Sequence, residues 1–103
     1  MRTKAIVGFA TLVLGVTPAL AQADANTGRY VAANCTNCHG TAGVAKAPMP
    51  SLAGQKKESI AEQMREFRDG KRMATVMHQI AKGYTDAQID AMADFFARQP
   101  AAR

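Results

Sequence analysis

The chain has 103 residues and a mass of 11.0 kDa, which allows one small domain and excludes a multidomain enzyme. Hydrophobic residues make up 48% of it and charged residues 20%, so it is neither a disordered chain nor, with two cysteines, a disulfide scaffold. Its net charge is +5, but the sequence has no arginine-rich patch interleaved with aromatic residues, so nucleic-acid binding is not indicated.

Residues 1–23 have the pattern of a secretory signal peptide. Arg2 and Lys4 precede an apolar run that ends in small-residue cleavage patterns at residues 19–23. The run is shorter than the roughly 20 residues of a membrane-spanning helix, so an uncleaved anchor is the weaker alternative. We expect residues 24–103 to be a soluble periplasmic domain without stable membrane insertion, and its formal charge falls from +5 to +3 once Arg2 and Lys4 are removed.

The remaining segment is small for a domain that must stabilise itself by its own core. Domains of this size usually carry a disulfide, a metal or a large buried cofactor, because they bury little apolar surface. Cys35 and Cys38 are the only cysteines and hence the only candidates for attaching one.

Apolar spacing predicts an all-α fold with about four helices. The predicted helices span residues 24–37, 55–69, 73–81 and 85–99. Residues 40–54 contain several glycines and prolines, which oppose regular secondary structure, so we expect them to form a long loop of the kind that wraps a ligand. Thr85 and Gln88 have the spacing of a capping box, which opens the last helix. The expected core residues on the longer helices are Ile60, Met64, Phe67, Ile89, Met92 and Phe96.

The chemistry of the chain is concentrated in the pentapeptide Cys35-Thr36-Asn37-Cys38-His39. Two thiols three positions apart can bond the two vinyl groups of one porphyrin, and the following histidine can ligate the iron. A thioredoxin-like dithiol would need a βαβ pattern, which is absent, and a zinc site would need ligands beyond His78. A plain disulfide would close a tight loop of little stabilising value and leave His39 unexplained. The motif therefore favours covalent haem.

With these residues the chain resembles the class I monohaem cytochromes c. The resemblance covers Gly28 and Tyr30, the motif through Gly40, Pro48, and the pair Phe95-Phe96. More narrowly, residues 48–54, 74–77 and 80–84 resemble the cytochrome subunit of flavocytochrome c sulfide dehydrogenase and related sulfur-oxidation cytochromes.

That resemblance implies a small cytochrome c fold in which the first and last helices cross beside one covalently attached haem c. It also implies His39 as proximal iron ligand, a methionine as distal ligand, and the carbonyl of Pro48 as acceptor of the His39 Nδ1 proton.

Several residues could provide the distal ligand. Met64 and Met92 lie on the apolar stripes of their helices and are expected in the core. Met73 and Met77 are four residues apart on one predicted helix, so periodicity accepts either, and the family resemblance favours Met77. His78 points about 100° away from Met77 on that helix and is expected in solvent; as a ligand it would make a bis-histidine site of lower potential.

An iron with both axial positions filled has no open site for substrate, which indicates an electron carrier and not an enzyme. We expect electrons to come from a flavoprotein dehydrogenase subunit of the sulfide dehydrogenase type. The alternatives are a free shuttle with transient partners and a five-coordinate gas-binding haem protein. A set of lysines flanks the loop and the predicted ligand segment and could orient docking to an acidic partner, namely Lys46, Lys56, Lys57, Lys71 and Lys82.

Overall fold

The structure is a computed structural model that describes residue 15 and residues 25–103. The predicted signal peptide therefore lies outside the described residues apart from Gly15, as does Asp24, the first residue of the first predicted helix. Within the described part, no helix is long and apolar enough to cross a membrane.

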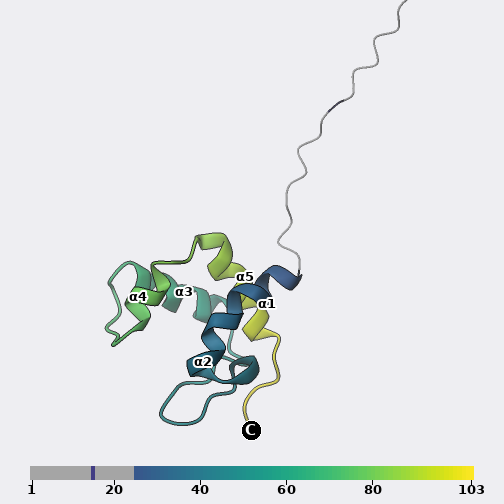
Figure 1. Cartoon of the computed structure of the whole chain (residues 1–103), viewed down its shortest axis with the longest axis vertical. Helices are drawn as coiled ribbons and strands as arrows, with labels where there is room; N and C mark the ends of the chain where they lie inside the picture. The colour runs from purple at the N-terminus through teal and green to yellow at the C-terminus, as the bar shows by residue number, and fades with distance from the viewer. Residues whose placement is uncertain (1–14, 16–24) are drawn as a thin grey trace, which may run out of the picture.

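The described residues form helices and loops and contain no strand (Figure 1), which confirms the all-α prediction. In chain order the helices are α1 (Ala25–Ala32), α2 (Thr36–His39), α3 (Lys57–Arg68), α4 (Met77–Ala81) and α5 (Asp86–Ala97). A 3₁₀ turn over Ala33–Cys35 joins α1 to α2, so the chain runs in nearly continuous helical turns up to His39. A second 3₁₀ turn, over Thr41–Gly43, opens the predicted loop.

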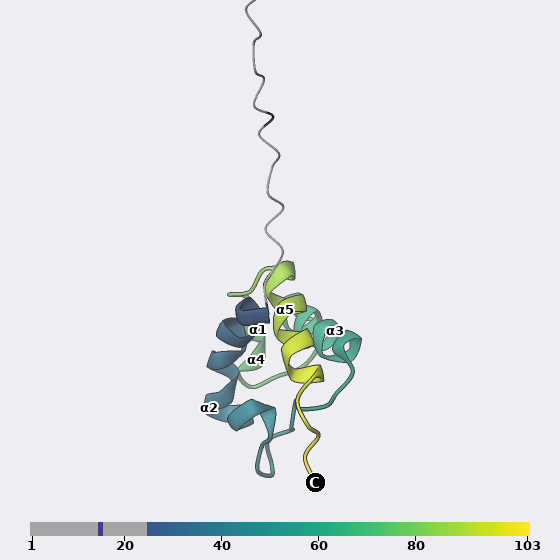
Figure 2. The same ribbon diagram turned by 90° about the vertical axis from the view of Figure 1, so that its right-hand side faces the viewer.

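Helices α1 and α5, the first and last of the described part, pack against each other (Figures 1 and 2). Gly28 of α1 makes this approach possible, because a Cβ there would lie 2.5 Å from the Ala91 carbonyl oxygen of α5. The crossing of the first and last helices expected from the resemblance is thus present. Helix α3 packs on α5 and on α4 and completes the bundle.

The core lies where α1, α3, α4 and α5 meet. Ile89, Met92 and Phe96 of α5 are almost fully buried, as their helical spacing predicted. Ile60 and Met64 of α3 join them, while Phe67 is only partly buried and packs at the edge of this cluster. The capping box of α5 is also confirmed, since Thr85 Oγ1 accepts from the Gln88 amide and Gln88 Oε1 accepts from the Thr85 amide.

Helix α4 is shorter than the sequence predicted. It begins at Met77, and the preceding residue, Val76, has φ −132° and ψ −34°, outside the helical region. The prediction of a helix over residues 73–81 is therefore wrong for residues 73–76. These residues all line one cavity, which four consecutive helical residues could not do, because successive helical side chains point about 100° apart.

Candidate haem site

Cys35 ends the 3₁₀ turn that joins α1 to α2, and Cys38 lies within α2, one residue before His39. Thr36 Oγ1 donates to the Ala33 carbonyl at 2.7 Å and supports this junction. Both thiols are free and both line the same cavity; Cys35 is partly buried and Cys38 exposed. Burial raises the pKa of the Cys35 thiol, and the neighbouring Cys38 raises it further.

His39 ends α2 and is the one buried polar side chain of the described residues, with 7% of its surface exposed. Its Nδ1 lies 2.7 Å from the carbonyl oxygen of Pro50. A carbonyl can only accept, so Nδ1 donates this bond, and in the neutral ring the lone pair is then on Nε2. That is the tautomer in which a histidine can ligate a metal, with its ring direction fixed by the second hydrogen bond.

The prediction that Pro48 supplies this carbonyl is wrong, because Pro50 supplies it. The loop between the motif and α3 closes on itself through Gly43, whose carbonyl accepts from the amides of Leu52 and Ala53 at 2.8 and 3.1 Å. This closure fixes the residues just before Leu52 beside His39. Pro48 is exposed and is not among the residues that line the cavity.

A largely apolar cavity of about 450 Å³ opens beside the motif. Helices α3, α4 and α5 and the loops before α3 and α4 build its walls together with α2. Its lining residues include Cys35, Cys38, His39, Gln55, Gln63 and Met77. Its volume is in the range of ligand sites in proteins.

Every sulfur-bearing side chain of the described residues lines this cavity. The methionines Met49, Met64, Met73, Met77 and Met92 join the two cysteines there. Cys35 Sγ lies 3.9 Å from Met92 Sδ, which connects the motif directly to the core of α5. Thioethers are apolar, flexible and polarizable, and they are also iron ligands in cytochromes.

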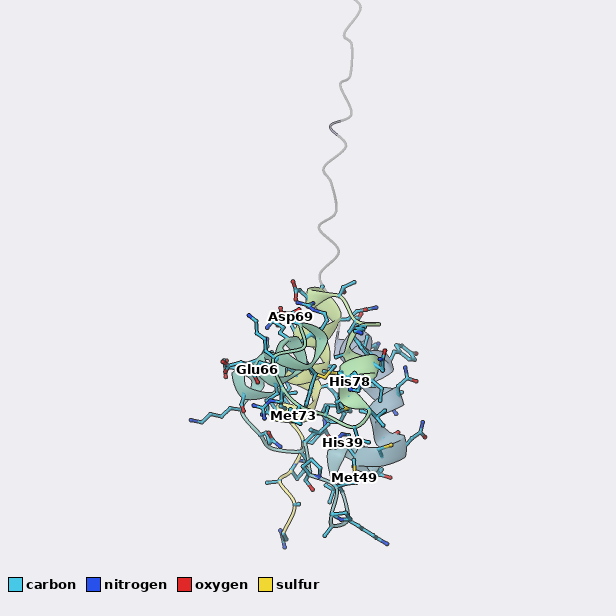
Figure 3. The ribbon with its side chains drawn as sticks, turned by 90° about the vertical axis from the view of Figure 1, so that its left-hand side faces the viewer. His39, Met49, Glu66, Asp69, Met73 and His78 are labelled. Carbon is cyan, nitrogen blue, oxygen red and sulfur yellow. The ribbon has the colours of Figure 1, made fainter. Side chains whose placement is uncertain are left out.

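Met73 and Met77 differ sharply in their surroundings. Met73 precedes α4 and is 98% exposed, whereas Met77 is the first residue of α4, is partly buried and packs against the core. Met73 and Met77 therefore do not share one helical face, contrary to the prediction from their spacing. His78 is also unlike its prediction, because it is half-buried and its Nδ1 is buried without a hydrogen-bond partner. Figure 3 shows His39, Met49, Met73 and His78 as sticks.

The residues that line the cavity fit a covalently bound haem. Two free thiols line it at the motif spacing, a buried imidazole is held by its Nδ1 and leaves Nε2 for a metal, and the remaining wall is mostly apolar. No group of three or more His, Cys, Asp or Glu residues in the described part could hold a metal ion by itself.

Residues 21–96 match the family described as cytochrome C oxidase, cbb3-type, subunit III. The chain belongs to this family of c-type cytochromes. As a cytochrome c, it carries out electron transfer with haem c bonded to the protein, which agrees with the thiols and imidazole described above.

Three individual relatives of this cytochrome are informative. The cytochrome subunit of sulfide dehydrogenase from Chlorobaculum tepidum is 36% identical over 86% of this chain and 81% of its own length. A thiosulfate dehydrogenase electron acceptor from Thiomonas intermedia is 39% identical over 65% of this chain and 32% of its own. The solved structure of cytochrome c4 from Acidithiobacillus ferrooxidans matches with a TM-score of 0.60 and 41% identity, over 61% of this chain and 37% of that one.

This cytochrome therefore spans most of its sulfide dehydrogenase relative and about a third of the other two proteins. The match to cytochrome c4 supports the small all-α cytochrome fold. The chain is thus a class I c-type cytochrome, similar to cytochromes that are named for sulfide and thiosulfate dehydrogenases.

The sequence did not single out Pro50, Gln55 or Gln63. Gln63 could have been found, because it is three residues after Ile60 and next to Met64, on the stripe predicted to face inward. Pro50 lies two residues from Pro48, and only the closure of the loop distinguishes the two carbonyls. Gln55 stands just before α3, where periodicity carries no signal.

Charge is distributed unevenly over this cytochrome. Asp86, Asp90 and Asp94 of α5 form ion pairs with α3, in which Arg65 Nη2 lies 2.7 Å from Asp90 Oδ1 and Arg68 Nη1 lies 2.8 Å from Asp86 Oδ1. Lys57 pairs with Asp94 at 3.8 Å. The other predicted docking lysines are exposed and form no ion pair among the described residues, namely Lys46, Lys56, Lys71 and Lys82.

Proposed function

We propose that this chain is an exported one-electron carrier whose iron is ligated by His39 and Met77 and which accepts electrons from a flavoprotein dehydrogenase subunit of the sulfide dehydrogenase type. The proposal rests chiefly on one observation, the single cavity lined by both cysteines, His39 and Met77. A bound haem iron supplies reversible gain and loss of one electron.

His39 and Met77 would together hold the haem iron and leave it no open position for substrate or oxygen. Support for His39 comes from its burial and from the Pro50 carbonyl that holds its ring. Support for Met77 over Met73 comes from packing, because Met77 is anchored against the core whereas the Met73 side chain lies almost wholly in solvent. An anchored thioether loses less conformational freedom on ligation.

The ligand assignment is tested by optical spectra of the exported protein, as purified and after reduction by dithionite. We expect sharp low-spin bands and, in the oxidised form, the weak far-red band of a sulfur-to-iron bond. A five-coordinate gas-binding protein would instead bind carbon monoxide in its reduced form at neutral pH, which would overturn the proposed ligation.

A flavoprotein donor is supported by the sulfide dehydrogenase cytochrome subunit, to which this chain is similar over most of both lengths. Free shuttling is the second candidate, and the similarity to a thiosulfate dehydrogenase electron acceptor favours it. Affinity purification of the tagged holoprotein from its native periplasm separates them. A stoichiometric flavin-containing partner supports the subunit, whereas a monomeric haem protein without flavin supports the shuttle.

Export is proposed from the pattern of residues 1–23. Covalent haem attachment in a periplasm would follow export of the unfolded chain. Mass spectrometry of the mature protein tests both points, since it should start near residue 24 and carry the mass of one haem. A membrane-bound protein that still carries residues 1–23 would instead favour the uncleaved anchor.

A further inference from the structure

The wall of the cavity has an unusual polar composition. None of the lining residues is a lysine, arginine, aspartate or glutamate. Haem, however, carries two carboxylates on the edge of its ring opposite the vinyl groups. Because Cys35 and Cys38 take the vinyl edge, the carboxylates need hydrogen-bond donors elsewhere in the wall, and the lining residues provide no cation there.

Four lining side chains other than His39 and the cysteine thiols can donate a hydrogen bond, namely Asn34, Gln55, Gln63 and Thr75. Asn34 adjoins Cys35 and therefore belongs to the vinyl edge. Thr75 is exposed, in the segment just before α4. Gln55 and Gln63 are half-buried. Gln63 belongs to α3, which both views of the ribbon draw apart from α2 (Figures 1 and 2), and Gln55 lies two residues before α3.

Neighbouring serines hold both glutamine amides. Gln63 Nε2 donates to Ser59 Oγ at 3.0 Å, one turn earlier on α3. Gln55 Nε2 donates to the Ser51 carbonyl, and Ser51 Oγ accepts from the Ala45 amide at 2.9 Å. Each amide nitrogen has two N–H groups, and these bonds use one of them. The second N–H of each glutamine is left for a ligand, on a side chain whose direction is already fixed.

We infer that Gln55 and Gln63 bind the carboxylates of the haem through these N–H groups. The inference rests on haem binding by the chain and adds residues that position it. Both donors are neutral, so they fix the carboxylates without cancelling their charge. The negative charge then continues to favour ferric iron, whereas a cation in the wall would oppose it.

Resonance Raman spectroscopy of the holoprotein tests this, because the bending mode of the haem carboxylates reports their hydrogen bonding. Gln55→Met and Gln63→Met remove the donor and keep the length of the side chain. We expect a shift of that mode in each variant. Gln79→Met is the matched control, since Gln79 is exposed on α4 and does not line the cavity; its mode should equal that of the wild type.

Gln63→Glu provides a second readout if Gln63→Met folds poorly. A carboxylate at this position adds negative charge beside the haem, and we expect a lower midpoint potential at neutral pH than in the wild type. Unchanged carboxylate modes in both methionine variants, or an unchanged potential in Gln63→Glu, would overturn the inference. Mass spectrometry of the wild type and of each variant shows whether haem is attached. A wild-type chain without haem would contradict the proposed function itself, whereas wild-type protein with haem and unchanged carboxylate modes in the variants would contradict only this inference.

Discussion

His39 and Met77 are held at the cavity by different parts of the chain. His39 is fixed by its burial and by one carbonyl of the loop that follows it, whereas Met77 is fixed by the packing of α4 against the core. The imidazole direction therefore depends on loop closure, and the thioether position depends on where α4 begins. The two proposed ligands should accordingly respond to different substitutions.

Met77→Ala should abolish the far-red band of the oxidised protein, because it removes the anchored thioether. Met73→Ala is the matched control, and it should leave the band in place, since the Met73 side chain is 98% exposed. Both spectra are recorded on protein with haem attachment verified by mass. Loss of the band in Met73→Ala with retention in Met77→Ala would transfer the ligand role to Met73.

At the scale of elements, the crossing of α1 and α5 depends on Gly28. Gly28→Ala would place a methyl group 2.5 Å from the Ala91 carbonyl oxygen, which is rigid backbone, so the helices must separate. Overpacking of this kind costs about 1–3 kcal/mol. We expect that loss in the free energy of unfolding of the holoprotein, measured by denaturant titration.

Gly83→Ala is the control for this experiment, because its new Cβ would lie 3.5 Å from the Ile80 carbonyl oxygen, an ordinary contact. It should change the free energy of unfolding by less than about 1 kcal/mol. Equal losses in the two variants would show that the close approach of α1 and α5 contributes nothing specific.

The ion pairs between α3 and α5 make part of the stability depend on pH. Hydrogen bonds from Arg68 and then from Arg65 hold the pKa of Asp86 below its ordinary value of 3.8. A lowered pKa in the folded state stabilises the fold above the ordinary pKa, and this contribution is lost as the pH falls through the folded value. Asp86→Asn should thus be less stable than the wild type at neutral pH, and the difference should vanish in acid.

Thermal unfolding of the holoprotein from neutral pH down to about pH 2 measures this difference. The control is Glu62→Gln, because Glu62 is exposed on α3 and forms no ion pair among the described residues. A gap between wild type and Asp86→Asn that persists unchanged into acid would contradict the role given to the carboxylate charge.

Across the whole molecule, the features that the sequence predicted correctly are those that neighbouring residues determine. The capping box of α5 and the inward stripes of α3 and α5 need only neighbouring residues, and all were predicted. The segment 73–76 was not predicted, because its residues have helical apolar spacing but line the cavity outside any helix, with α4 beginning only at Met77. The choice of Pro50 over Pro48 likewise depends on the closure of Leu52 and Ala53 onto Gly43, several residues away.

The distribution of charge also belongs to the whole molecule. Ion pairing neutralises the acidic residues of α5 against α3, while Lys46 is exposed beside Cys38 in a shallow depression next to the motif. We expect this asymmetry to attract anions toward the side of the molecule where the haem is bonded. Oxidation of the reduced protein by hexacyanoferrate(III), an anion, should therefore be faster at low ionic strength, as measured by stopped flow.

Lys46→Gln should slow that reaction a few-fold at low ionic strength and flatten its salt dependence, because it removes one steering charge. Lys57→Gln serves as the control, since Lys57 is paired with Asp94 on the α3–α5 face and should change the rate less. With tris(phenanthroline)cobalt(III), a cation, the effect of Lys46→Gln should reverse and the rate should rise. Equal effects of the two substitutions on the anionic oxidant would mean that net charge alone, and not the place of Lys46 beside the motif, governs the approach of an acidic partner.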